Sequence, residues 1–153
     1  MRSLELKIPP AALGLLLGAL MWATARSLPA LGLALPAGPV IAGILAAVGV
    51  LVALLGVVSF RSAKTTVNPL SPETASALVT SGIYQRTRNP MYLGMLLVLL
   101  GWAVFLANVL TLLFPAVFVV LMNRLQILPE ERALTAMFGS KFADYQSRVR
   151  RWL

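Results

Sequence analysis

The chain has 153 residues, of which 59% are hydrophobic and 12% charged, and its net charge is +8. A soluble domain has about 45–50% apolar and about 25% charged residues, so this composition excludes an ordinary soluble globule and a disordered chain. It predicts an integral membrane protein that forms a single domain, 1–153. The basic residues flank apolar runs, which indicates contact with a lipid bilayer and its anionic surface, and no nucleic acid as partner.

The residue types limit the possible chemistry. The sequence has no cysteine and no histidine, which excludes thiolate and imidazole catalysis and removes the usual ligands of zinc, so we expect no metal. It has five acidic residues in all. Any catalysis therefore depends on a few polar groups or on a cofactor that brings its own reactivity.

An uncharged run near the N-terminus predicts a first transmembrane helix. It begins at Pro9 and Pro10, where proline suits the first helical turn, and it continues to Arg26. Residues 23–25 (ATA) resemble a signal-peptidase site. Because further apolar runs follow, we interpret this segment as a retained span.

A second span follows a loop. Three prolines and two glycines lie within 29–39, which is typical of a loop, and the span itself is expected over 40–60. The two N-terminal spans together occupy 1–60.

A third uncharged run covers 89–123. As one helix it would measure roughly 53 Å, whereas the hydrocarbon core of a bilayer is about 30 Å thick. The run therefore predicts a tight hairpin of two short transmembrane helices, with a turn near Asn108 and a kink at Pro115. The fold expected is an all-α integral membrane protein with four transmembrane helices.

The distribution of charge predicts the orientation. The 61–90 segment and the tail hold most of the Arg and Lys residues, while the turns at 29–39 and 107–109 hold none. By the positive-inside rule, both termini and the 61–90 loop are cytoplasmic, which agrees with four spans. The short length and the Ala-, Leu- and Gly-rich spans favour a bacterial inner membrane.

The tail predicts a C-terminal amphipathic cytoplasmic helix over 129–149. Its apolar side chains recur at helical spacing. They are Leu134, Phe138, Phe142, Tyr145 and Val149. Two adjacent acids, Glu130 and Glu131, follow Pro129 at its start, where they would complement the helix dipole or bind a ribose hydroxyl or an ammonium group.

Two polar motifs precede the third uncharged run. Residues 88–94 (RNPMYLG) predict a helix start with Asn89 as N-cap and Arg88 at the lipid headgroups, and such a start also offers N–H groups to a carboxylate. Residues 78–84 (LVTSGIY) indicate either an ordinary turn at Gly82 or a loop that holds a ligand. No dinucleotide fingerprint or Walker loop occurs, and no acid of the kind a proton-coupled transporter needs lies in a span.

In this order and spacing, these motifs resemble the isoprenylcysteine carboxyl methyltransferases and the related phospholipid methyltransferases. The resemblance rests on 78–84, 88–94, Glu130-Glu131 and 138–145 (FGSKFADY), and it covers roughly 64–153. It implies that 61–153 is the cofactor-binding methyltransferase core and that 1–60 contributes two variable N-terminal spans. It implies S-adenosyl-L-methionine as cofactor and an amphiphilic small-molecule or lipidated acceptor that arrives from the bilayer.

The resemblance also implies which residues serve the reaction. The cofactor-binding residues carried over are Ser76, Ala77, Leu78, Val79, Tyr84, Arg88, Asn89, Pro90, Met91, Tyr92, Glu130 and Glu131. Tyr92 and Glu130 are the candidate catalytic residues, mainly through orientation, because methyl transfer from a sulfonium already has an activated leaving group.

Three departures from the family pattern affect the acceptor and the tail. Asn89 replaces a histidine, Gln126 replaces an acceptor-binding arginine, for which Arg124 is the substitute, and Arg150 replaces a proline. A carboxylate acceptor and a lipid-headgroup amine both remain open. The alternatives to an enzyme are a non-enzymatic membrane scaffold of the same fold and a small four-helix transporter. The sequence leaves the oligomeric state undetermined.

Overall fold

The structure is a computed structural model, and residues 5–63 and 77–153 are described. These residues form helices and contain no strand, which confirms the all-α class. The principal elements are α1 (Pro10–Ser27), α2 (Gly38–Ser62), α3 (Pro90–Leu106), α4 (Leu113–Met122), a π-helical turn (Asn123–Ile127), α5 (Leu128–Phe138) and α6 (Ser140–Arg148). Short 3₁₀ turns lie at Pro29–Leu31, Gly82–Gln85 and Val109–Leu112.

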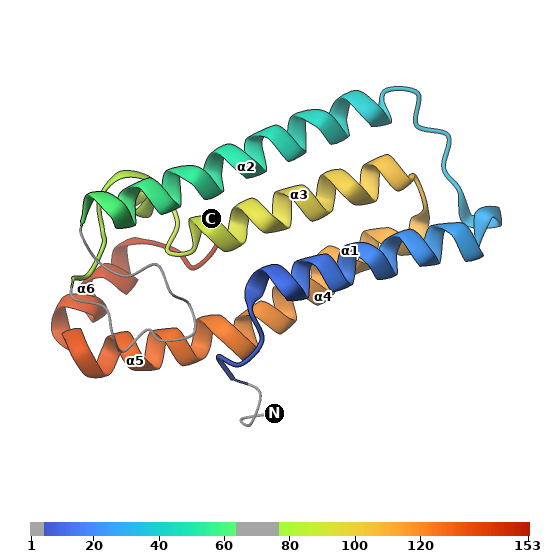
Figure 1. The fold of residues 1–153 in the computed structure, drawn as a ribbon. Helices are drawn as coiled ribbons and strands as arrows, with labels where there is room; N and C mark the ends of the chain where they lie inside the picture. Colours follow the sequence, from blue (N-terminus) through green and yellow to red (C-terminus); the bar gives the residue numbers. More distant parts are fainter. Residues whose placement is uncertain (1–4, 64–76) are drawn as a thin grey trace.

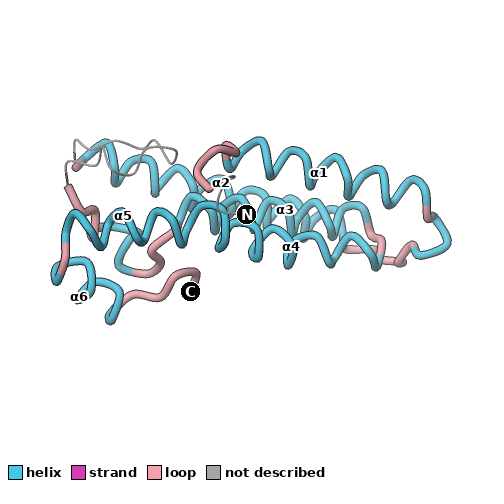
Figure 2. The backbone as a smooth tube through the Cα atoms, turned by 90° about the horizontal axis from the view of Figure 1, so that it is seen from below, coloured by secondary structure: helices cyan, strands magenta, loops and turns pink. Residues whose placement is uncertain are grey.

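Helices α1 to α4 lie side by side in an elongated bundle, and α5 and α6 lie at the end where α2 stops and α3 begins (Figures 1 and 2). Helix α2 packs on α3, and α3 packs in turn on α1 and α4. The main core lies between α1, α3 and α4. Its most buried members are Met21, Phe118, Met122 and Ile127, each 0% exposed.

Two helical stretches are long and apolar enough to cross a membrane. They are Gly38–Ser62 and Val109–Phe138, and the apolar helix Pro90–Leu106 is shorter. The first of them buries few of its side chains within the protein, so that Val40, Ile44 and Leu51 are more than half exposed. The number of spans and their orientation remain predictions.

The two uncharged loops meet at the end of the bundle opposite α5 and α6 (Figure 1). The N–H of Leu33 donates to the carbonyl of Ala107 over 2.6 Å, and Nδ2 of Asn108 donates to the carbonyl of Leu28 over 2.9 Å. Asn108 is 2% exposed, and its Oδ1 also accepts from the N–H of Leu110. The side chain of Asn108 therefore hydrogen-bonds to the backbone of both loops, the one after α1 and the one between α3 and α4.

The long helical run from Leu113 to Phe138 is irregular at a place that the sequence pattern does not predict. Pro115 is the third residue of α4, which continues directly from the 3₁₀ turn Val109–Leu112, and the kink expected at this proline stays a prediction. The irregularity is the π-turn Asn123–Ile127, which directly precedes the buried Pro129. Proline lacks the N–H that the carbonyl of Leu125 would otherwise accept, and that carbonyl accepts from the N–H of Leu6 instead, over 2.9 Å.

The single helix expected over 129–149 is also wrong, because the chain turns at Gly139. That glycine has φ +51° and ψ −124°, a conformation open to glycine alone, and it separates α5 from α6. The prediction of one shared apolar face is confirmed. All five of its residues, from Leu134 to Val149, join a second hydrophobic cluster with Val79 and Tyr84.

Glycines allow α2 and α3 to pack backbone to backbone. A Cβ added at Gly49 would lie 2.6 Å from the carbonyl oxygen of Gly94, and one added at Gly94 would lie 2.4 Å from that of Gly49. These distances are far shorter than any van der Waals contact, so a side chain at either position would force the helices apart.

We expect Gly49→Ala to destabilise the protein by about 1–3 kcal/mol, the typical cost of overpacking a tight contact. Gly43→Ala in the same helix is the matched control, because a Cβ there meets nothing within 4 Å. It should be neutral or stabilising by up to about 1 kcal/mol, since alanine favours a helix. Thermal unfolding in detergent measures both, and equal unfolding temperatures for the two variants would contradict the close α2–α3 contact.

Candidate functional site

A cavity of about 100 Å³ lies where the end of α2, the 77–84 segment and the start of α3 meet α5 and α6. Its lining residues are Phe60, Ala77, Leu78, Val79, Tyr84, Arg88, Asn89, Met91, Tyr92, Ile127, Glu130, Glu131, Leu134, Phe142 and Tyr145. The cavity thus combines two carboxylates and one guanidinium with several aromatic and aliphatic walls.

Most of the residues expected to bind the cofactor come together at this cavity. Those that line it are Ala77, Leu78, Val79, Tyr84, Arg88, Asn89, Met91, Tyr92, Glu130 and Glu131. Pro90 is buried at the start of α3 but does not line the cavity, and Ser76 lies outside the described residues. At the cavity, residues from 77–92 lie next to Glu130 and Glu131. That these residues bind the cofactor stays a prediction.

The two candidate catalytic residues touch each other. The hydroxyl of Tyr92 donates a hydrogen bond to Oε1 of Glu130. Tyr92 is 5% exposed and lies in the first turn of α3, while Glu130 lies on α5. Tyr92 donates to Oε1 of Glu130. The other carboxylate oxygen, Oε2, can therefore accept a hydrogen bond from a bound molecule.

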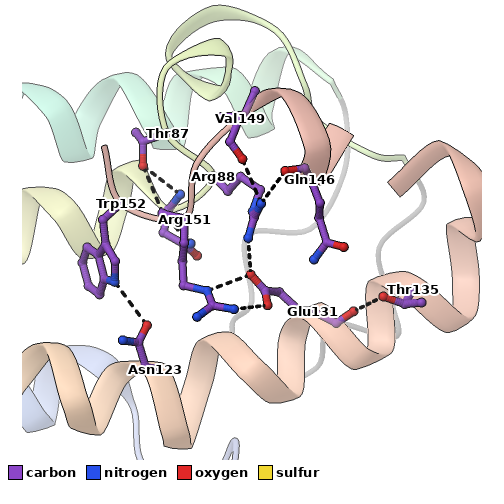
Figure 3. Close-up of polar contacts among 10 residues, drawn as sticks. Thr87, Arg88, Asn123, Glu131, Thr135, Gln146, Val149, Arg151 and Trp152 are labelled. Carbon is purple, nitrogen blue, oxygen red and sulfur yellow. Dashed lines mark hydrogen bonds and ion pairs between the residues drawn. The ribbon is translucent and has the colours of Figure 1, made fainter. Parts of the chain in front are cut away.

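Glu131 has a different environment from its neighbour. Nη2 of Arg88 donates to its Oε1 over 2.7 Å, and Arg151 donates from Nε to Oε1 over 3.0 Å and from Nη2 to Oε2 over 2.7 Å (Figure 3). The Glu131 side chain is 14% exposed. Both of its oxygens are therefore held by arginines, and the hydrogen bonds to Glu131 raise the pKa of Arg151 further above its usual range.

Arg88 joins three segments of the chain. Besides Glu131, its Nη1 donates to the carbonyls of Gln146, over 3.1 Å, and Val149, over 2.8 Å, at the end of α6 (Figure 3). A cation at this place complements the helix dipole. The Arg88 side chain is 11% exposed, so the expectation that it reaches the lipid headgroups is wrong. Its Nε is buried and has no hydrogen-bond partner among the described residues.

Asn89 precedes α3 but does not cap it with its side chain. Its Nδ2 donates instead to the carbonyl of Arg151, over 2.9 Å, and its N–H donates to Oγ1 of Thr87. Thr87, which is 1% exposed, donates in turn to the same Arg151 carbonyl over 3.3 Å. The amide of Asn89 thus fixes the tail beside the cavity.

Aromatic side chains also line the cavity. The hydroxyl of Tyr145 donates to the carbonyl of Tyr84 over 2.7 Å, and the two tyrosines are 4% and 5% exposed. Burial raises the pKa of Tyr145 to about 12, so this hydroxyl keeps its proton at physiological pH. Phe60 packs edge to face on Tyr84, with ring centroids 5.3 Å apart.

Five lining residues were not identified from the sequence as part of the site. They are Phe60, Ile127, Leu134, Phe142 and Tyr145. The helical spacing of Leu134, Phe142 and Tyr145 marked them as one apolar face. Their place at the cavity depends on the turn at Gly139, which folds α6 back beside the 77–84 segment.

The residues expected to bind the acceptor do not line the cavity. Gln126 is 1% exposed, and its Nε2 donates to the carbonyl of Ile8, just before α1, over 2.6 Å. Arg124 is exposed on the π-turn. The assignment of either residue to the acceptor remains a prediction.

Comparison with known proteins agrees with this geometry. A family model described as phospholipid methyltransferase matches residues 37–141, which include the motifs at 78–84 and 88–94 and both glutamates. The chain belongs to the phospholipid methyltransferase family. The resemblance inferred from the motifs is thereby confirmed, and the match extends it toward the N-terminus to include α2.

Membership in the phospholipid methyltransferase family indicates methyl transfer at a membrane as the general activity. An uncharacterized protein of Haemophilus influenzae is 43% identical over 63 residues, which are 41% of this chain and all of that protein. No solved structure matches the chain.

Proposed function

We propose that this protein is an integral membrane methyltransferase that uses S-adenosyl-L-methionine to methylate an amphiphilic acceptor within the bilayer. The observation that carries the proposal is the cavity itself. In a chain of the phospholipid methyltransferase family, it places Tyr92 and Glu130 in contact beside the two polar motifs.

The donor set of the cavity fits this cofactor. A carboxylate needs a donor, and the buried Nε of Arg88 lacks a partner among the described residues. An ammonium group or ribose hydroxyl needs an acceptor, and Glu130 supplies one. A purine needs apolar or aromatic contact, which Tyr84, Phe142 and the 77–79 segment provide.

The chain's contribution to the reaction is orientation. When bound, S-adenosyl-L-methionine supplies an activated methyl group on a sulfonium sulfur. Glu130 and the Nε of Arg88 would fix its polar end, while Met91 and Leu134 exclude water from the apolar side of the cavity. Tyr92 fixes the direction of the Glu130 carboxylate by its hydrogen bond.

The polar groups of the cavity favour an amine of a lipid headgroup over a carboxylate as the acceptor. An amine arrives as an ammonium ion and must lose a proton. Oε2 of Glu130 is the available base, because a carboxylate oxygen has a second lone pair besides the one that the cofactor would occupy. A carboxylate acceptor would need a free cation. Gln126 stands where the resemblance places an arginine, and Arg151 is engaged by Glu131. Arg88 is engaged by Glu131 too, and its Nε would be taken by the carboxylate of the cofactor.

The exposed side chains support placement in a bilayer with four spans. Along α1 and α2 many large apolar residues are exposed, including Leu15, Val40 and Ile44 at 76%, 66% and 58%. In water, such an apolar surface would be a strong aggregation liability. We propose that α1 to α4 all cross the membrane, with both termini in the cytoplasm. A bacterial inner membrane suits this arrangement.

The orientation predicts opposite accessibility of the two bundle ends. Because the chain has no native cysteine, labelling of an introduced cysteine reports the accessibility of that position alone. In intact cells, a membrane-impermeant maleimide should label Leu33→Cys in the uncharged loop, and it should label Ser147→Cys on α6 only after permeabilisation. Both positions are exposed. The reverse pattern would overturn the proposed topology.

Cofactor binding is tested by calorimetry with S-adenosylhomocysteine on detergent-purified protein. We expect Glu130→Gln to weaken binding by about 10- to 100-fold, which corresponds to losing a hydrogen bond to a charged group. Tyr92→Phe, which removes only the hydroxyl that orients Glu130, should weaken binding by about 2- to 10-fold. Asp144→Asn removes the same charge at an exposed site and should bind like the wild type. Absence of binding by folded wild-type protein would favour a scaffold or a transporter.

The acceptor class is tested by turnover. Transfer of labelled methyl groups from S-adenosyl-L-methionine should occur with an aminophospholipid in mixed micelles and be absent with a prenylated cysteine carboxylate. With the aminophospholipid, Glu130→Gln should lower kcat by about 10²- to 10⁴-fold, the usual contribution of a general base. Turnover of the carboxylate alone would contradict the assignment of the acceptor.

A further inference from the structure

The C-terminal tail crosses the start of α3 and is held there by its backbone. The N–H of Arg88 donates to the carbonyl of Arg150 over 3.0 Å, and the carbonyl of Arg151 accepts from Asn89 and Thr87. Nε1 of Trp152 donates to Oδ1 of Asn123 over 3.1 Å (Figure 3). The tail is therefore fixed without the side chain of Arg151, which is left to make other contacts.

The side chain of Arg151 donates hydrogen bonds to both carboxylate oxygens of Glu131. Its Nε donates to Oε1 over 3.0 Å and its Nη2 to Oε2 over 2.7 Å. A planar guanidinium that binds a carboxylate in this forked way fixes the orientation of the carboxylate as well as its position. Lysine, as a point charge, cannot reproduce that constraint.

Glu131 is joined rigidly to the residue that faces the cavity. Neighbouring residues on an α-helix differ by about 100° in direction, so Glu130 and Glu131 point to different sides of α5. Glu130 meets Tyr92, while Glu131 meets the two arginines. Any rotation of α5 about its axis moves both carboxylates together.

We propose that Arg151 is a positioning residue for Glu130. By holding Glu131, it fixes the rotation of α5 at which Glu130 faces the cavity and Tyr92. This inference rests on the proposed cofactor site. It gives the tail a part in cofactor binding without a contact of its own with the cofactor.

The test compares four proteins by calorimetry with S-adenosylhomocysteine and by thermal unfolding. Arg151→Gln should weaken binding by about tenfold, which is a loss of one order of magnitude in the binding constant. Arg151→Lys, which keeps the charge but not the fork, should have intermediate affinity. Arg150→Gln is the matched control, because its side chain is exposed and only its backbone carbonyl is used, and it should bind like the wild type.

A double-mutant cycle distinguishes positioning from a general loss of stability. If Arg151 acts through Glu130, Arg151→Gln should add little further loss of affinity in the Glu130→Gln protein. Independent, additive losses would overturn the proposal, as would wild-type affinity in both Arg151→Gln and Arg151→Lys. If Arg151→Gln does not fold, Arg151→Lys and its combination with Glu130→Gln give the same comparison. Absence of binding by folded wild-type protein overturns this inference together with the proposed function.

Discussion

The ion pairs of Glu131 with Arg88 and Arg151 are the constraint on which the end of the bundle depends. In so apolar a chain, a partly buried carboxylate needs compensation, and here two guanidiniums provide it from 43 and 20 residues away in the sequence. One arginine belongs to the segment before α3 and the other to the tail. The segment before α3, the tail and α5, which also carries Glu130, are thereby joined at a single carboxylate.

This arrangement divides the work between two adjacent acids. Both oxygens of Glu131 accept hydrogen bonds from arginines. Among the described residues, Glu130 accepts a side-chain hydrogen bond only from the neutral hydroxyl of Tyr92, which leaves its second oxygen for a bound molecule. From the sequence alone, Glu130 and Glu131 are equivalent, because both lie at the start of a predicted helix. The helix-dipole interpretation does not apply, because α5 continues from the π-turn and has no free N-terminus. What separates the two acids is the 100° between consecutive helical residues and the partners on each side.

Much of the fold follows from local rules that the sequence displays. Uncharged runs bounded by proline and arginine predicted where α1, α2 and α3 lie. The length of the third run predicted a turn near Asn108, and the structure places that residue in the turn between α3 and α4. The family resemblance carried by the polar motifs also implied most of the polar residues that line the cavity. Other features depend on contacts between distant segments, which periodicity does not encode. The return of α6 at Gly139 and the capture of Arg88 by the end of α6 are of this kind.

Pro129 shows how a local property of one residue can determine contacts between distant segments. Its missing N–H releases the carbonyl of Leu125, and its ring cannot follow a regular helical turn, so the preceding turn widens into a π-turn. The N-terminal segment supplies the replacement donor from Leu6, and Gln126 in the same turn bonds to Ile8. A widened turn changes the direction of every side chain that follows it. The direction in which Glu130 points therefore depends on the N-terminal segment, which bonds to the π-turn before α5, as well as on the arginines that bind Glu131.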